Sequence, residues 1–274
     1  PPPCCATGQA GTSAKGLPPM TEPPMVHLER RDRGVALLTL DDPRRANAFT
    51  PAMCDQIGAA MDKVEADRSF RSLVVTGAGK YFCAGADLSS LGASRDEGLR
   101  AIYEGFLRIA RCSLPTVAAV NGAAVGAGMN LALATDVRIA SVNARFDTRF
   151  LALGIHPGGG HSWMLRRAVG HAEAAAMMLF GEVVDGAESE RRGLTRRCVG
   201  AEELIPTTVE LAGGASNTPR DLLVRATATL RTIDTSANHD EAVERELVNQ
   251  LWSMDQPDFA ERLAALSRRV QAGA

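Results

Sequence analysis

Two glycine-rich segments hold the residues whose spacing most clearly suggests chemistry. Residues 82–88 read Phe-Cys-Ala-Gly-Ala-Asp-Leu, and residues 121–130 read Asn-Gly-Ala-Ala-Val-Gly-Ala-Gly-Met-Asn. Small side chains let a ligand approach the backbone closely. The second segment follows an apolar run and begins a predicted helix, so its unpaired N–H groups and the helix dipole suit a negatively charged oxygen. Either segment alone is equally consistent with glycines used for tight packing.

The spacing of these glycines argues against two common nucleotide-binding motifs. Gly122, Gly126 and Gly128 match neither the dinucleotide fingerprint nor the Gly-Lys-Ser/Thr ending of a phosphate-binding loop. A nicotinamide-dependent oxidoreductase is therefore a weak hypothesis. The six cysteines include no Cys-x-x-Cys pair, and their spacing fits neither a zinc site nor a disulfide framework. We interpret them as reduced thiols of a cytoplasmic protein.

The two segments lie within an alternation of predicted strands and helices. Apolar runs predict strands at residues 35–40, 73–76, 116–120 and 137–140, and helical spacing predicts helices at 51–66, 96–111 and up to residue 134. This alternation is typical of the α/β class. The remainder is mostly helical, with helices expected near residues 160–169, 172–180, 187–192, 202–213, 219–231, 239–252 and 257–270.

The composition is that of an ordinary soluble protein. The 274 residues are 45% hydrophobic and 23% charged, and the net charge of −2 gives no cationic field for nucleic acid. Residues 114–134 carry no charge, but their glycines, asparagines and Pro115 predict a buried strand, loop and helix instead of a membrane helix. Residues 1–24 are rich in Pro, Gly, Ser and Thr and are expected to be disordered, with Met20 or Met25 a candidate natural start.

Together and in this order, the glycine-rich segments resemble those of the enoyl-CoA hydratase/isomerase family, also called the crotonase family. The resemblance covers about residues 26–270. Further matching pieces are Asp42-Pro43, Asn47-Ala48-Phe49, residues 114–122 and 136–140, Phe146, Leu153-Gly154, Pro157-Gly158-Gly159, residues 181–185 with Gly193-Leu194, and Asp258-Phe259 before Arg268-Arg269.

The resemblance implies a crotonase-type spiral of repeated β-β-α turns with a helical C-terminal module. The expected organisation is a disordered extension at residues 1–24, an acyl-CoA-binding core at 25–200 and a helical oligomerisation or lid module at 201–274. Relatives of this kind form trimers or pairs of trimers, so the resemblance implies a homo-trimer or a dimer of trimers. Coenzyme A would be part of the substrate, and no separate cofactor or metal is expected.

The resemblance also implies roles for individual residues. The backbone amides of Ala86 and Ala127 would form an oxyanion hole, in which two N–H donors stabilise the negative charge of a thioester enolate. The implied substrate-binding residues are Arg45, Ala48, Ala84, Asp87, Leu88 and Gly126. Turn capping by Asp87, and solvation of Arg44 and Arg45 on a loop, are the simpler alternatives for these charged residues.

The chain departs from the family where hydratases carry two glutamates that position and deprotonate water. The corresponding positions are Asn130 and Phe150, and neither side chain can act as a base. Candidate replacement groups are Asp87, Asp147, His156 and His161, with His156 the first candidate for a base. The alternative for both histidines is a hydrogen-bonded loop or helix-start residue, and a metal site built from them has no evident further ligand.

Two hypotheses about function follow from this reading. The first is an enzyme that acts on an acyl-CoA through a thioester enolate, in fatty-acid or related acyl-CoA metabolism, with hydration by paired glutamates disfavoured. The second is a non-catalytic acyl-CoA-binding protein, which the loss of both glutamates beside two intact loops favours. Turnover of enoyl-CoA substrates distinguishes the two.

Overall fold

A six-stranded, mostly parallel sheet forms the centre of the molecule. The computed structural model describes residues 24–87 and 95–271. The strand order is β1-β2-β3-β5-β7-β10, and only the β1–β2 pair is antiparallel. The bounds are β1 Val26–Arg31, β2 Val35–Leu40, β3 Ser72–Gly77, β5 Thr116–Val120, β7 Val137–Ser141 and β10 Arg197–Val199. Every residue of β3 and β5 is buried, as expected for parallel strands covered on both faces.

A second sheet of four short strands lies beside the first and holds the glycine-rich loops. Its order is β4-β6-β8-β9. The bounds are β4 Tyr81–Cys83, β6 Ala123–Val125, β8 Arg145–Asp147 and β9 Val184–Asp185. Each of the successive units β3-β4-α2, β5-β6-α3 and β7-β8-α4 contributes one strand to the large sheet, then one strand to the small sheet, and then a helix. This confirms the predicted spiral of β-β-α turns.

The helices of the core follow the predicted periodicity closely. The bounds are α1 Pro51–Ala66, α2 Arg95–Ala110, α3 Ala127–Leu133, α4 His161–Leu179, α5 Gly186–Arg191 and α6 Leu204–Gly213. Helix α1 begins where expected because Thr50 caps it, accepting a hydrogen bond from the Met53 amide at 3.1 Å. The two helices predicted at 160–169 and 172–180 are one element, α4, which Gly170 interrupts with φ 79°.

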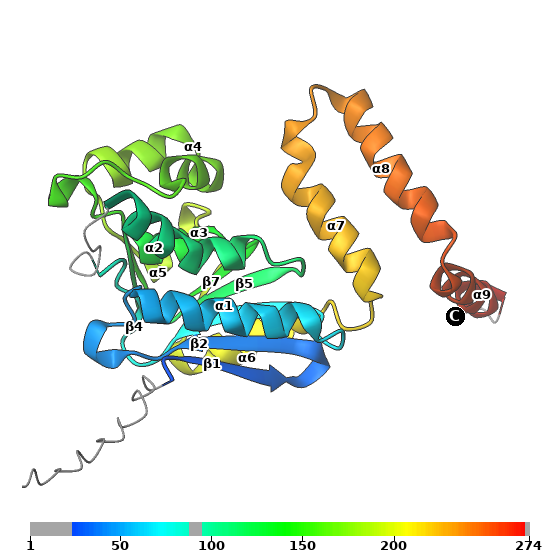
Figure 1. Ribbon diagram of the computed structural model, residues 1–274. Coiled ribbons are helices and arrows are strands. Elements are labelled where there is room, and N and C mark those ends of the chain that lie inside the picture. The colour runs from blue at the N-terminus through cyan, green and yellow to red at the C-terminus, as the bar shows by residue number, and fades with distance from the viewer. Residues whose placement is uncertain (1–23, 88–94, 272–274) are drawn as a thin grey trace, which may run out of the picture.

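The C-terminal third begins against the core and then leaves it. Helix α6 packs on the outer face of the large sheet, where Leu204 and Ala212 join Val35, Val74 and Val117. Helices α7 (Arg220–Thr232), α8 (His239–Met254) and α9 (Pro257–Gln271) then project from the core as an arm (Figure 1). Helices α8 and α9 contain no buried residue. The role assigned to residues 201–274 in oligomerisation or as a lid stays a prediction.

Arg231 connects the C-terminal end of α7 to the core. Its guanidinium donates to both carboxylate oxygens of Asp136, at 2.7 and 2.6 Å, and to the carbonyls of Cys112 and Leu114. Asp136 in turn accepts from the backbone and side chain of Thr116 at the start of β5. The last turn of α7 is therefore connected, through Asp136, to the N-terminal end of β5 in the interior of the large sheet.

The uncharged stretch at residues 114–134 forms β5, β6 and α3, as predicted from its glycines and asparagines. No helix in the described ranges is long and apolar enough to span a bilayer. The predicted disorder of residues 1–24 falls almost wholly on residues 1–23, which lie outside the described part of the chain.

Candidate functional site

The two glycine-rich loops meet directly, and their glycines are what allows it. A Cβ atom on Gly85 would lie 2.7 Å from the Val125 carbonyl oxygen and 3.6 Å from the Ala127 nitrogen. A Cβ on Gly128 would overlap the Cys83 carbonyl. Gly126 adopts φ 52°, a left-handed conformation that favours glycine. Tight packing of the two loops is therefore sufficient to explain these glycines, and close approach of a ligand stays a prediction.

The amides of Ala86 and Ala127 are both left without acceptors. Ala86 forms an isolated parallel bridge with Phe49, in which Phe49 donates to the Gly85 carbonyl at 2.7 Å and Asp87 donates to Phe49 at 2.9 Å. The N–H of Ala86 takes no part in that bridge. Ala127 is the first residue of α3, where no helical carbonyl is available to its N–H. Among the described residues, neither N–H has a hydrogen-bond partner.

Both alanines line a cavity of about 570 Å³ between the loops, α2 and the segment before α4. Its wall is largely apolar, and its polar side chains are those of Tyr103, Asn130, Thr148, Arg149 and His156. No aspartate or glutamate of the described ranges lines it. An apolar cavity with a few convergent polar groups is the usual form of a small-molecule site.

Asn130 and Phe150, which the family resemblance assigns to the glutamate positions, both line this cavity, and neither carries a carboxylate. Asn130 is buried, and its Nδ2 donates to the Gly158 carbonyl at 3.0 Å while its Oδ1 lies 2.7 Å from His161 Nδ1. The ring of Phe150 stands edge-on to His161, with centroids 4.9 Å apart. The amide and the phenyl ring are therefore fixed in place by the same histidine.

His161 is held neutral. Because Asn130 Nδ2 donates to Gly158, Asn130 Oδ1 must be the acceptor facing His161, and His161 Nδ1 therefore carries the proton. Burial lowers the pKa of the imidazole to about 4. Its Nε2 is buried and has no partner among the described residues. His161 is the first residue of α4, which matches the helix-start alternative.

His156 differs from His161 in exposure. It lies at the cavity, is exposed to solvent, and its Nδ1 contacts the neighbouring Pro157 carbonyl at 2.7 Å. Asp147, another candidate, is engaged by Arg149, whose Nε donates to it at 2.9 Å. Of the candidate acids and bases, His156 is thus the one that reaches the cavity with a ring nitrogen still available.

The residues implied for coenzyme A binding lie near the first glycine-rich loop. Arg45 pairs with Asp42 at 3.1 Å, and its Nε lies 3.9 Å from the Asp87 carboxylate. Ala48 is buried, and the Ala84 amide donates to the Ala46 carbonyl at 3.0 Å. Leu88 lies outside the described residues. The arrangement brings Arg45, Ala48, Ala84 and Asp87 to one region and leaves their contact with a ligand as a prediction.

Cysteine and metal chemistry have little support at this site. Cys83 ends the strand before the first loop, and burial raises the pKa of its thiol to about 12, so it is not a thiolate. Within residues 24–87 and 95–271, no cluster of three or more His, Cys, Asp or Glu side chains is placed to hold a metal ion.

The sequence-based reading missed Tyr103 and Arg149, which supply polar groups to the cavity. Tyr103 follows Ile102 on α2, and the predicted apolar face of that helix gave no reason to single it out. Arg149 has φ 55°, an uncommon conformation for a residue other than glycine, and nothing in the sequence signals it.

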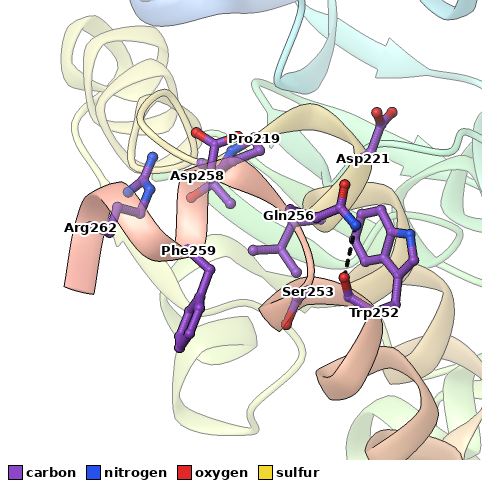
Figure 2. Close-up of a pocket in the computed structure, with 10 residues that line it drawn as sticks. Pro219, Asp221, Trp252, Ser253, Gln256, Asp258, Phe259 and Arg262 are labelled. Atoms are coloured by element: carbon purple, nitrogen blue, oxygen red, sulfur yellow. Dashed lines mark hydrogen bonds between the residues drawn. The ribbon is translucent and has the colours of Figure 1, made fainter. Parts of the chain in front are cut away.

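A second cavity, of about 270 Å³, lies far from these loops in the C-terminal arm (Figure 2). It is bordered by Pro219 at the start of α7, by Trp252 on α8 and by Phe259 on α9. The hydrogen bond drawn in Figure 2, from Gln256 Nε2 to the Trp252 carbonyl at 2.8 Å, closes the end of α8. This cavity is a gap between the arm helices, and its lining includes the charged residues Asp221, Asp258 and Arg262.

The converging loops, the β-β-α spiral and the apolar cavity define a crotonase-type protein. The model of the enoyl-CoA hydratase/isomerase family matches residues 30–267, so this chain belongs to that family. A probable enoyl-CoA hydratase of Mycobacterium tuberculosis is 47% identical over 247 residues, covering 87% of this chain and 96% of the relative. The 1,2-epoxyphenylacetyl-CoA isomerase of Escherichia coli is 36% identical over 200 residues, covering 70% and 76%.

Solved structures agree with this membership. A probable enoyl-CoA hydratase/isomerase from Mycobacterium abscessus superposes with a TM-score of 0.82 at 32% identity, covering 90% of this chain and 97% of the other. The enoyl-CoA hydratase of Bacillus anthracis gives a TM-score of 0.84 at 24% identity, over 90% and 97% of the two chains, and supports the fold alone.

Proposed function

We propose that this protein is an enzyme that binds an acyl-CoA thioester and stabilises its enolate between the amides of Ala86 and Ala127. The observation that carries the proposal is the pair of unpartnered N–H groups on two loops that meet at one apolar cavity. Preorganised donors of this kind are worth most where negative charge develops, and loss of one typically costs about 3 kcal/mol of barrier.

The reaction is a rearrangement or proton transfer at the acyl chain, with hydration by paired glutamates disfavoured. Asn130 and Phe150 occupy the two glutamate positions, and Asn130 already uses both ends of its amide. Relatives named as hydratase and as isomerase both support an acyl-CoA substrate. His156, exposed at the cavity, is the proposed proton acceptor.

A second candidate is a non-catalytic acyl-CoA-binding protein. The absence of any carboxylate among the described residues that line the cavity favours it. Such a protein would retain the two loops and the cavity that bind the thioester but would lack a strong base. Both candidates share the same thioester site and differ in turnover.

The proposal also covers the oligomeric state of the protein and its location in the cell. We propose a homo-trimer or dimer of trimers, which the exposed leucines Leu247, Leu251, Leu263 and Leu266 of the arm support. We also propose a cytoplasmic location, which fits the free thiols of Cys54, Cys83, Cys112 and Cys198.

The test combines binding and turnover. Calorimetric titration with butyryl-CoA measures binding without chemistry, and incubation with crotonyl-CoA and longer enoyl-CoA esters, followed by chromatography, measures any product. Binding with conversion supports the enzyme, and saturable binding without product supports the carrier. Absence of binding by any acyl-CoA would overturn both.

A further inference from the structure

Tyr103 brings an unused hydroxyl group to the acyl cavity. It lies on α2, is half-buried, and packs its ring against Phe106 with centroids 5.8 Å apart. Within the described ranges, the hydroxyl has no hydrogen-bond partner. The hydroxyl of a buried tyrosine usually finds a partner, because one end of this side chain is polar and the other apolar. An unpaired hydroxyl that faces a cavity is available to the molecule that fills it.

The glycine after Pro157 makes room for this hydroxyl. A Cβ atom on Gly158 would overlap the Tyr103 oxygen. Gly158 is not among the glycines with positive φ, so the backbone at this position does not require glycine. Its small size is therefore explained by the approach of Tyr103. Gly158 thus helps to shape this wall of the cavity.

Gly158 also connects Tyr103 to Asn130. Its carbonyl accepts from Asn130 Nδ2 at 3.0 Å, so Tyr103 and Asn130 flank one residue. Asn130 Nδ2 has a second N–H beyond the one given to Gly158. No described carboxylate lines the cavity to accept from either group. This wall offers hydrogen-bond donors where the family's hydratases place an acidic side chain.

We propose that Tyr103 is a specificity-determining residue that donates a hydrogen bond to an oxygen substituent on the acyl chain. The preferred ligands are acyl-CoA thioesters whose chain carries a hydroxyl, oxo or carboxylate oxygen in addition to the thioester carbonyl. The inference rests on the proposed function, since it takes acyl-CoA binding in this cavity as given. A site built to hydrogen-bond a ligand discriminates against the analogue that lacks the bonding group.

The test compares acyl-CoA esters that differ in one oxygen-bearing group. Calorimetric Kd values are measured for butyryl-CoA and for 3-hydroxybutyryl-, acetoacetyl- and succinyl-CoA. One net hydrogen bond predicts that at least one oxygenated ester binds about 3- to 10-fold more tightly than butyryl-CoA. Tyr103→Phe should abolish this preference and leave the Kd for butyryl-CoA within about twofold, because the ring and its packing remain.

The chain supplies a matched control for each substitution. Its only other tyrosine, Tyr81, is 43% exposed and outside the cavity, so Tyr81→Phe should retain the preference. Gly158→Ala should displace the Tyr103 hydroxyl and weaken the preference, whereas Gly58→Ala, with open space around its Cβ position, should not. In protein labelled with 3-fluorotyrosine, the fluorine resonance assigned to Tyr103 should shift with the preferred oxygenated ester and shift less with butyryl-CoA.

The possible results distinguish failure of the role proposed for Tyr103 from failure of acyl-CoA binding itself. Binding of butyryl-CoA with no preference for any of the three oxygenated esters would overturn the role of Tyr103 and leave acyl-CoA binding intact. A preference that survives in Tyr103→Phe would also overturn it. Failure of every ester to bind would instead overturn the proposed function, and the role of Tyr103 with it.

Discussion

Protonation of His161 should destabilise the protein at mildly acidic pH. The His161 side chain is 1% exposed, its Nδ1–H donates to Asn130 Oδ1, and its unprotonated Nε2 has no hydrogen-bond partner in the described structure. A second proton would place a charge and an unpaired N–H in a buried site, which is costly. This is the physical reason that burial lowers the pKa of His161 from 6.5 to about 4.

The size of the effect follows from linkage. The unfolded chain binds a proton on this residue near pH 6.5, whereas the folded protein resists it down to about pH 4. The stability contributed by neutral His161 is therefore complete above pH 6.5 and is lost as pH falls toward 4. Each pKa unit is worth about 1.4 kcal/mol, so the free energy of unfolding should fall by about 2 kcal/mol between pH 7 and pH 5.

Urea denaturation of the wild type and of His161→Gln, at pH 7 and at pH 5, measures this effect. Glutamine cannot titrate, so the variant should lose about 2 kcal/mol less than the wild type over the same interval, even though it is less stable at pH 7. His171→Gln on the exposed side of α4 is the control and should retain the wild-type pH dependence. Equal pH dependence in the wild type and His161→Gln would refute the assignment of His161 as a buried neutral residue.

Three further predictions concern the site and the assembly. Ala127→Pro should abolish acyl-CoA binding with an unchanged circular dichroism spectrum, because proline fits the first position of a helix but removes the N–H. Ala127→Gly keeps the N–H and should bind almost normally. An unchanged Kd for the proline variant would contradict this prediction. Spectrophotometric assay should detect little or no hydration of crotonyl-CoA, since lost general acid–base catalysis costs about 10²–10⁴-fold. The double substitution Asn130→Glu with Phe150→Glu should raise that rate, provided the folded state tolerates the buried carboxylates. Efficient hydration by the unmodified protein would point to another base, which His156→Ala then tests. Sedimentation velocity at micromolar concentration should give a species built on threefold symmetry, and a stable monomer would count against it.

Apolar runs and helix-start residues made most strands of the large sheet and most helices predictable, whereas the spiral arrangement was predicted from the family resemblance. The bounds of α1 follow from Thr50 and Pro51, and those of β2 and β5 from runs of buried apolar residues. The strands of the small sheet were not predicted. They are two or three residues long, too short for a periodic signal, and their pairing depends on tertiary contacts.

The candidate site was predictable only as far as its backbone. The loops at Ala86 and Ala127 are marked by glycines. The assignment of Asn130 and Phe150 to the glutamate positions rests on the family resemblance and stays a prediction. The difference between His156 and His161 could not be predicted, because both flank the same glycine run and only packing buries one of them. Tyr103 was missed because a tyrosine on an amphipathic helix is more often part of the core.

Isotope-edited infrared spectroscopy of a bound acyl-CoA tests the central claim most directly. Butyryl-CoA labelled with carbon-13 at the thioester carbonyl reports the hydrogen bonds which that oxygen accepts. If Ala86 and Ala127 both donate to it, the carbonyl stretch of the bound ester should move to lower frequency than in water, and any ester still bound by Ala127→Pro should show a smaller shift. Saturable binding with an unshifted carbonyl band would contradict the account.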